Sequence, residues 1–296
     1  MDTIIDIQKL SYSYNNNFKA LDDISIRVPR GAVYGFLGPN GAGKSTTMRM
    51  LAGIMPDESG AVRLFGAPLG GQLPGIYSKI GCLVEQPVLY SHLTAKDHLE
   101  LVLKSNALAL DKIDPILEMV GLTKAKHLAV KRYSLGMKQR LAIGLCLVKE
   151  PELLLLDEPV NGLDPNGMQE VREMLLRLNE QHGITIFISS HLLAELEKMC
   201  SHICIINKGK IHFEGTMQEL KLKFEGTPVR ITIGDYDGPV SLPGYEVLRK
   251  EHTVTCHLQS RNEIPVIVSR LVEQGIPVYE VKQEGSLESW FMDIIQ

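Results

Sequence analysis

Residues 38–46 combine glycines, a lysine and two hydroxyl side chains in the order that a phosphate-binding loop requires. Glycines let successive backbone N–H groups curve around anionic phosphates, and the positive end of a following helix attracts the same charge. Lys44 can then reach the β- and γ-phosphates, and the Ser45 hydroxyl can bind the magnesium ion that bridges them. The pattern predicts binding of ATP or GTP. The residues of this candidate nucleotide site are Gly38, Pro39, Asn40, Gly41, Ala42, Gly43, Lys44, Ser45 and Thr46.

The elements around the loop favour the same interpretation. An apolar, strand-like run at residues 33–37 precedes it, and a helix-forming stretch at residues 47–51 follows it. A strand that leads into the loop and a helix that leaves it form the context in which such a loop binds phosphates. The alternative is a chance match in a glycine-rich turn, which is disfavoured because every fixed position of the motif is filled.

A second group of candidate residues follows the apolar run at residues 153–156, which leads into Asp157 and Glu158. A buried strand that ends in Asp157 places one carboxylate beside the magnesium ion, and Glu158 can polarise a water molecule in line with the γ-phosphate. The alternative is a surface acid pair after a core strand. Together with the phosphate-binding loop, the pair predicts an ATPase that uses Mg2+.

Residues 133–140 read Tyr-Ser-Leu-Gly-Met-Lys-Gln-Arg. This segment resembles the Leu-Ser-Gly-Gly-Gln signature of the nucleotide-binding subunits of ABC transporters, and the resemblance extends in order over residues 1 to about 222. Ser134 and Gly136 match the signature, whereas the residues after each of them depart from it. Ser134 is also a good N-cap, so its hydroxyl and the positive end of the following helix can face one anion. In the family, that anion is the γ-phosphate on the opposite subunit.

Two later segments match the same family. Residues 161–165 resemble its D-loop, with Asp164 at the acidic position. Residues 189–191 end an apolar strand and resemble the segment of its switch histidine. The resemblance implies that His191 hydrogen-bonds the γ-phosphate and holds Glu158 or the attacking water in place.

Two positions match the family less closely. Tyr14 falls where the family stacks an aromatic ring on adenine; Tyr12 competes for that role, and a solvent-facing loop aromatic is the alternative. Residues 80–87 align with the glutamine loop so that Glu85 occupies the glutamine position and Gln86 follows it. Either side chain is a candidate metal ligand. A carboxylate there adds negative charge near the magnesium ion, which predicts an altered metal preference or slower turnover.

Hydrophobic patterns predict an α/β fold for residues 1–222. Residues 4–10 and 21–28 alternate apolar and polar side chains, as two antiparallel strands do. Helical periodicity indicates a helical insert at residues 88 to about 147. Strand-like runs separated by helical stretches, the rhythm of a parallel sheet, lie at residues 153–156, 185–189 and 204–207. We expect a P-loop NTPase core with an antiparallel β subdomain and this insert.

The composition changes after about residue 222 to β-rich alternation between Gly and Pro turns, which predicts a separate small α+β domain at residues 223–296. The expected order is βββαβα. Its clearest elements are strands at residues 229–233, 254–258 and 277–281 and helices at residues 264–272 and 287–295. No catalytic constellation appears in this domain, so its role stays open between a dimer brace, a regulatory module and a docking surface.

Bulk composition limits the function classes. A 44% hydrophobic content over 296 residues suffices for one large core and a smaller second one. A net charge of −4 provides no overall basic field, so we expect no nucleic acid as partner. No apolar run reaches the roughly 18 to 20 residues of a membrane span, and residues 1–6 do not resemble a secretory signal, which predicts a cytoplasmic chain.

The five cysteines are odd in number and scattered, a pattern that favours reduced core thiols over a disulfide framework. Cys200, His202 and Cys204 suggest a metal site, but no second ligand pair follows at zinc-site spacing, so core packing is the favoured interpretation. The cysteines are Cys82, Cys146, Cys200, Cys204 and Cys256.

The resemblance to ABC transporters implies that ATP lies between two such subunits, identical or closely related, and that an integral membrane permease docks near residues 88–90 at the inner face of the membrane. The signature variant, the loop around Glu85 and the appended domain resemble most the bacterial bacitracin-resistance and lantibiotic-immunity exporters of drugs and peptides. The alternative is a soluble ABC-type ATPase that acts on nucleic acid or the ribosome, which the single phosphate-binding loop and the missing basic tract disfavour. A P-loop kinase or GTPase leaves the signature and His191 without a role.

Overall fold

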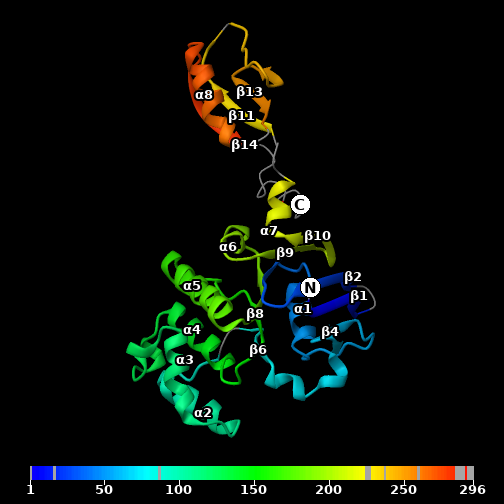
Figure 1. The fold of residues 1–296 in the computed structure, drawn as a ribbon, viewed down its shortest axis with the longest axis vertical. Coiled ribbons are helices and arrows are strands. Elements are labelled where there is room, and N and C mark those ends of the chain that lie inside the picture. The colour runs from blue at the N-terminus through cyan, green and yellow to red at the C-terminus, as the bar shows by residue number, and fades with distance from the viewer. Residues whose placement is uncertain are drawn as a thin grey trace. The chain divides into compact units, whose positions relative to one another are not determined.

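The structure is a computed structural model that describes residues 2–15, 18–85, 88–223, 228–236, 238–258, 261–283 and 291. The chain divides into two compact units, Met1–Gly215 and Thr216–Gln296 (Figure 1). The helix α7 (Met217–Leu222) belongs to the second unit. The domain boundary predicted after residue 222 stays a prediction.

A six-stranded central sheet organises the first unit, in the order β10-β9-β3-β8-β7-β6. Strands β9, β3, β8, β7 and β6 run parallel to one another, as predicted. Helices cover such a sheet on both faces, which explains why its strands are continuous apolar runs. The strands are β3 (Val33–Leu37), β6 (Ile80–Leu83), β7 (Leu153–Asp157), β8 (Thr185–Ser190), β9 (His202–Asn207) and β10 (Lys210–Thr216).

The register of the central sheet brings three strand ends to one edge. Leu37, the last residue of β3, lies opposite Ser190 at the end of β8. Asp157, the last residue of β7, lies opposite Ser189. The loops that leave β3, β7 and β8 therefore start side by side at the carboxyl edge, where ligands bind in open α/β sheets.

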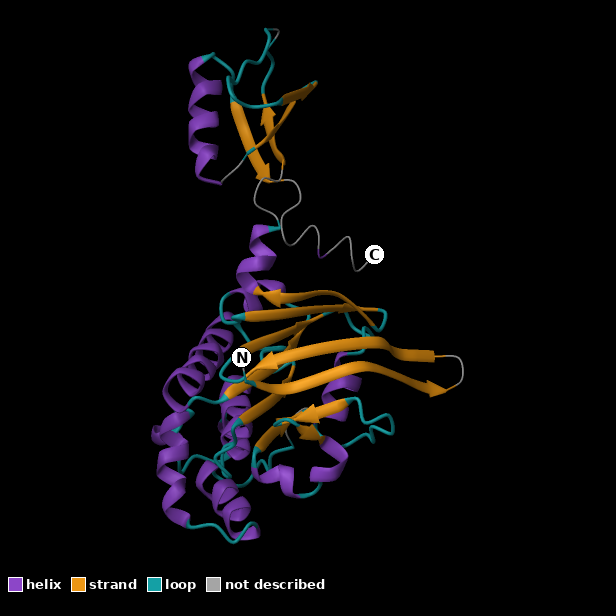
Figure 2. Cartoon of the chain, turned by 45° about the vertical axis from the view of Figure 1, so that its right-hand side comes forward, coloured by secondary structure: helices purple, strands orange, loops and turns teal. Residues whose placement is uncertain are grey.

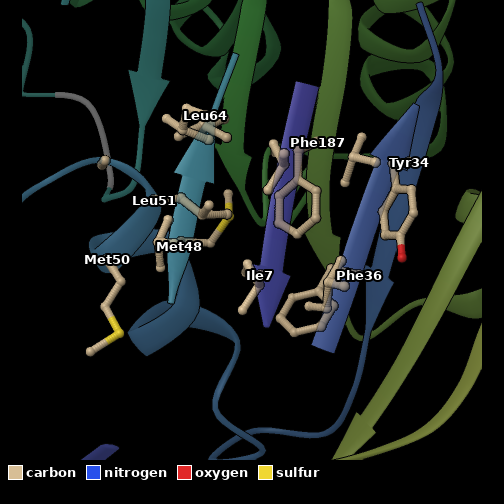
Figure 3. Packing of buried hydrophobic residues seen from close by; sticks show 14 of the residues in the cluster. Ile7, Tyr34, Phe36, Met48, Met50, Leu51, Leu64 and Phe187 are labelled. Carbon is tan, nitrogen blue, oxygen red and sulfur yellow. The ribbon is translucent and has the colours of Figure 1, made fainter. Parts of the chain in front are cut away.

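A second, four-stranded sheet has the order β2-β1-β4-β5 and is antiparallel, as predicted for its first two strands. Its strands are β1 (Thr3–Asn15), β2 (Phe18–Pro29), β4 (Val62–Leu64) and β5 (Ala67–Pro68). Both sheets and the helix α1 (Lys44–Leu51) contribute to one hydrophobic core. Figure 3 shows this core, with Ile7 of β1, Leu64 of β4, Leu51 of α1, Phe36 of β3 and Phe187 of β8 among its side chains.

The predicted helical insert is present. Its helices α2 (Ala95–Ser105), α3 (Ile113–Met119) and α4 (Leu135–Cys146) pack against one another (Figure 1). Two further helices, α5 (Pro165–His182) and α6 (Leu193–Glu197), connect the strands of the central sheet. Short 3-10 helices lie at Leu69–Gln72, Gly75–Ser78, Leu110–Lys112, Thr123–Ala125, Val130–Arg132 and Arg261–Glu263. Among the described residues, no helix has both the length and the apolar character that crossing a membrane requires.

The second unit is an antiparallel sheet in the order β12-β13-β11-β14, with α8 (Ile264–Glu273) along it (Figure 2). Its strands are β11 (Pro228–Ile233), β12 (Val247–Lys250), β13 (Thr253–His257) and β14 (Val278–Gln283). Alternate residues of β11 and β13 are buried together with Ile267 and Leu271 of α8. This arrangement confirms the predicted βββαβ order, whereas the helix expected at residues 287–295 lies outside the described residues apart from Phe291.

The cysteines are free thiols, as predicted. Burial raises the pKa of both Cys82 and Cys146 to about 12, so these thiols stay protonated near neutral pH. Cys200 and Cys204 are buried, and no cluster of three metal-ligating side chains occurs among the residues that the structure describes.

Candidate nucleotide site

The phosphate-binding loop joins the end of β3 to the start of α1, and two of its glycines are sterically required. A Cβ on Gly38 would overlap the carbonyl oxygen of Ile206. Gly43 has a φ of +113°, and a Cβ there would lie 2.8 Å from the carbonyl oxygen of Ala20. The loop borders a pocket of about 290 Å³ whose lining residues include Tyr14, Ala20, Asn40, Gly41, Gly43, Lys44, Ser45, Thr46 and Glu158.

Lys44 is a buried cation, only 6% exposed. Its Nζ donates to the carbonyl oxygens of Gly38, at 2.7 Å, and Pro39, at 3.2 Å. The same atom lies 3.3 Å from Glu158 Oε1. A buried charge is tolerated when it is paired and hydrogen-bonded. The loop and the acidic strand end therefore already hold the lysine in the place from which it can reach phosphates.

Glu158 links this lysine to the end of β8. Its second carboxylate oxygen, Oε2, accepts a hydrogen bond from His191 Nδ1 at 2.8 Å. Its backbone has a φ of +49°, a left-handed conformation that costs a non-glycine residue about 1 kcal/mol. The backbone N–H of Glu158 donates to Ser189, to the carbonyl oxygen at 3.2 Å and to Oγ at 3.1 Å. These contacts hold the carboxylate between Lys44 and His191.

Two of the predicted magnesium ligands, Ser45 and Asp157, lie in the first turn of α1 and at the end of β7. Ser45 is the first exposed residue of α1, and it lines the pocket of the phosphate-binding loop. Asp157 is half-buried at the end of β7 and accepts a hydrogen bond from the hydroxyl of Ser189. A hydroxyl and a carboxylate are hard oxygen ligands, and Mg2+ takes few of these besides water and phosphate. The residues present therefore fit this ion.

Glu85, the other candidate metal ligand, is 74% exposed and forms an ion pair with Arg49 of α1, with Oε1 3.2 Å from Nη2. With Asp157 and Glu158 it also lines a cleft of about 400 Å³. Gln86 lies outside the described residues. The structure thus brings Glu85 to the acidic strand end while a cation holds its carboxylate.

The two candidate aromatic residues differ in position. Tyr14 lines the pocket of the phosphate-binding loop, and its hydroxyl lies within hydrogen-bond distance of Thr46 Oγ1, at 3.1 Å. Tyr12 packs edge-on against Tyr14 with ring centroids 5.1 Å apart, and it lines a separate cleft with Asp57. The geometry favours Tyr14 as the residue that contacts a bound base.

The signature and D-loop residues lie at the starts of two helices. Ser134 caps α4 by accepting a hydrogen bond from the N–H of Met137 at 3.2 Å, and Asp164 caps α5 in the same way. A Cβ on Gly136 would lie 3.4 Å from the Cα of Gly167, so the two helix starts pack closely. Among the described residues that line the pocket of the phosphate-binding loop, none is Ser134, Gly136 or Asp164.

Two residues of the site were not singled out in the sequence. The hydroxyl of Ser189 accepts a hydrogen bond from the backbone N–H of Glu158 and donates one to the carboxylate of Asp157. In the sequence, a hydroxyl residue at the end of an apolar strand could have pointed to this role. Arg49 holds Glu85, and no motif marked it.

A parallel sheet with a phosphate-binding loop after β3 and an acid pair at the end of β7 defines a P-loop NTPase. A family model described as "ABC transporter" matches residues 21–161. The chain belongs to the ABC transporter ATP-binding proteins.

Three relatives illustrate this membership. The bacitracin transport ATP-binding protein BcrA of Bacillus licheniformis is 38% identical over an alignment that covers 100% of this chain and 98% of the relative. The lantibiotic transport ATP-binding protein SrtF of Streptococcus pyogenes is 41% identical over 71% of this chain and 90% of the relative. The structure of cbiO1 from Clostridium perfringens, part of the ABC transporter complex cbiONQ, superposes with a TM-score of 0.69 at 30% identity, covering 75% and 91% of the two chains. This chain is therefore an ATP-binding subunit of an ABC transporter and an ATPase, and such a subunit works with a membrane permease.

Proposed function

We propose that this chain hydrolyses ATP with Mg2+ to power export of a drug or antimicrobial peptide through a separate integral membrane permease. The observation that carries the proposal is the similarity, over nearly the whole of both chains, to a bacitracin transport ATP-binding protein. Val88 and Tyr90, at the two ends of the predicted docking segment, are 93% and 55% exposed, which suits a surface that a partner covers. The chain then works in the cytoplasm, held peripherally at the inner face of the cell membrane.

In this proposal, Glu158 orients the attacking water. Lys44 and His191 hold its two carboxylate oxygens from opposite sides, at 3.3 and 2.8 Å. Lys44 and the backbone N–H groups of the loop bind the phosphates, and Tyr14 contacts the adenine. Ser45 and Asp157, with Glu85 or Gln86 as a further ligand, would hold Mg2+, which would neutralise phosphate charge.

Ser134, Gly136 and Asp164 act in trans, on the nucleotide of a second nucleotide-binding subunit. The proposal rests on their position at two capped helix starts, away from the pocket lining of their own chain. A capped helix start offers N–H groups and a positive dipole end to an anion. A two-fold dimer then completes two identical sites.

Mixing variants tests the shared site. Lys44→Ala and Ser134→Arg each inactivate both sites of a homodimer, but a dimer with one chain of each variant keeps one intact site. We expect the mixture to regain ATPase turnover. The control mixture, Lys44→Ala with Asp157→Ala, damages the same half of the site in both chains and stays inactive. Ser134→Arg chains with normal turnover would contradict the role in trans.

Purification of the tagged chain from detergent-solubilised membranes tests the transport role. We expect a multi-span permease in stoichiometric amount. Recovery only in the soluble fraction, or together with ribosomes or nucleic acid, would instead favour the soluble ABC-type ATPase.

A further inference from the structure

The sheet of the second unit has two outer strands, β12 and β14, among the described residues. Outer strands present backbone groups that can pair with another chain, and charged side chains usually discourage this. β12 is four residues long and ends in two adjacent basic residues, Arg249 and Lys250. β14 is longer and carries an acidic and a basic residue, Glu280 and Lys282, two positions apart. β12 therefore presents charges of one sign to a pairing strand, whereas β14 presents charges of both signs.

The register of β14 against β11 fixes where its side chains point. Glu280 lies opposite Thr232, and Lys282 lies opposite Arg230, which is exposed. These positions share the sheet face away from the hydrophobic core. Val281 lies between them, opposite the buried Ile231, and packs against the core. The two charges of β14 thus stand on one face, on either side of an inward-facing valine.

We propose that β14 pairs antiparallel with β14 of a second copy of this chain, about a two-fold axis at Val281. This register sets Glu280 opposite Lys282 of the partner subunit and Lys282 opposite Glu280 of the partner subunit. Val281 lies opposite Val281 of the partner subunit on the core side. The two four-stranded sheets become one continuous sheet through an isologous contact.

The charges select this register over its neighbours. In a two-fold antiparallel pairing, residues that lie opposite each other point to the same face of the sheet. The neighbouring registers are therefore those in which the two-fold axis passes through the residue before or after Val281. An axis at Glu280 sets two carboxylates against each other, and an axis at Lys282 sets two ammonium groups against each other. Opposite charges across strands stabilise a pair, whereas like charges destabilise it. Of these three registers, only the one with its axis at Val281 places Glu280 and Lys282 of each strand opposite a residue of the other charge.

Such a contact makes the second unit a dimer brace that needs no nucleotide. Two chains held at their second units have a high effective concentration of their nucleotide sites, because the later closure around ATP becomes intramolecular. The inference does not depend on the transported substrate or on the roles of the catalytic residues.

Sedimentation of the full-length chain without nucleotide tests the proposal. We expect a reversible dimer that Glu280→Lys and Lys282→Glu each weaken about tenfold or more, since each change turns two attractions into two repulsions. The double variant, E280K with K282E, restores both pairs and should restore the dimer. Lys250→Glu on β12 makes the same charge change as Lys282→Glu on the other edge and should leave the dimer unchanged.

A cysteine at the axis tests the register separately. In Val281→Cys the two new thiols face each other across the strands, so we expect a covalent dimer under mild oxidation, which Tyr279→Cys forms far more slowly. A wild-type chain that stays monomeric without nucleotide, or a double variant no better than its parents, would overturn the proposal. ATPase turnover of the same preparations shows whether the nucleotide sites are intact, and so separates this failure from a failure of the proposed function.

Discussion

The two units differ in what they bury. In the first unit, Lys44 and the hydroxyl residues Ser189 and Ser190 are buried beside apolar strands. In the second unit, the described buried cluster is apolar, from Val229 to Ile276. Burying polar groups costs free energy unless each finds a partner. In the first unit, the buried polar groups lie at the strand ends, beside the candidate catalytic residues. The buried residues of the second unit serve packing alone.

Glu158→Gln offers the largest expected effect and acts on the first unit alone. Removing a group that orients and activates water lowers turnover by about 10² to 10⁴-fold. Nucleotide binding should persist, so that ATP-dependent dimers accumulate. Turnover and gel filtration with ATP measure both effects, and Glu173→Gln on the exposed side of α5 serves as control. A Glu158→Gln chain with normal turnover would remove Glu158 from the mechanism.

Leu271→Ala should disturb only the second unit. Leu271 is fully buried in the core of that unit, and its truncation costs about 2 to 5 kcal/mol. Val272 is 57% exposed, so Val272→Ala is a matched neighbour with little effect. Denaturant unfolding and nucleotide binding, measured together, should separate the two units. If Leu271→Ala also abolished nucleotide binding, the contrast between the units would not hold.

Tyr14→Ala sharpens the description of the first unit. An aromatic ring stacked on a base contributes about 1 to 3 kcal/mol, so nucleotide affinity should fall accordingly. Tyr12→Ala removes the ring packed against Tyr14 and should have the smaller effect. Titration with a fluorescent ATP analogue measures both variants. Equal losses would assign the contact to the aromatic pair rather than to Tyr14.

Glu85→Gln is expected to have the smallest effect. The ion pair with Arg49 is exposed, and such pairs contribute about 0 to 1 kcal/mol. We therefore expect a shift of about twofold to fivefold in the Mg2+ concentration for half-maximal turnover. Arg49→Gln breaks the same pair but leaves the carboxylate, so it separates the charge near the metal from the ion pair. If Glu85→Gln and the parent chain needed the same Mg2+ concentration for half-maximal turnover, Glu85 would not be a metal ligand.

Sequence patterns predicted the first unit well where residue type and spacing carry the physics. Apolar runs predicted β7, β8 and β9, and Ser134 predicted the start of α4. Short strands escaped prediction, because β4 and β5 have three and two residues and show no period. Contacts between distant segments also escaped, such as the one that joins Arg49 to Glu85.

The backbone of Glu158 had no signal in the sequence. Glutamate gives no reason to expect a φ of +49°, a conformation in which its N–H donates to Ser189 of the neighbouring strand. In the second unit, alternation sufficed for β11 and β13, since one face is buried and the other is not. Its outer edges depend on strand order, which alternation alone does not determine.

The ion pair between Lys44 and Glu158 supplies the lysine with a counter-ion from its own chain. In the role proposed for Lys44, a bound phosphate replaces this carboxylate as the partner of the lysine. Nucleotide affinity then reflects the difference between two anionic partners rather than the full attraction to phosphate. The same carboxylate can form its ion pair with the lysine again when the product leaves. An ATPase must release its product in every cycle, and a carboxylate that competes with the product for the lysine favours this release.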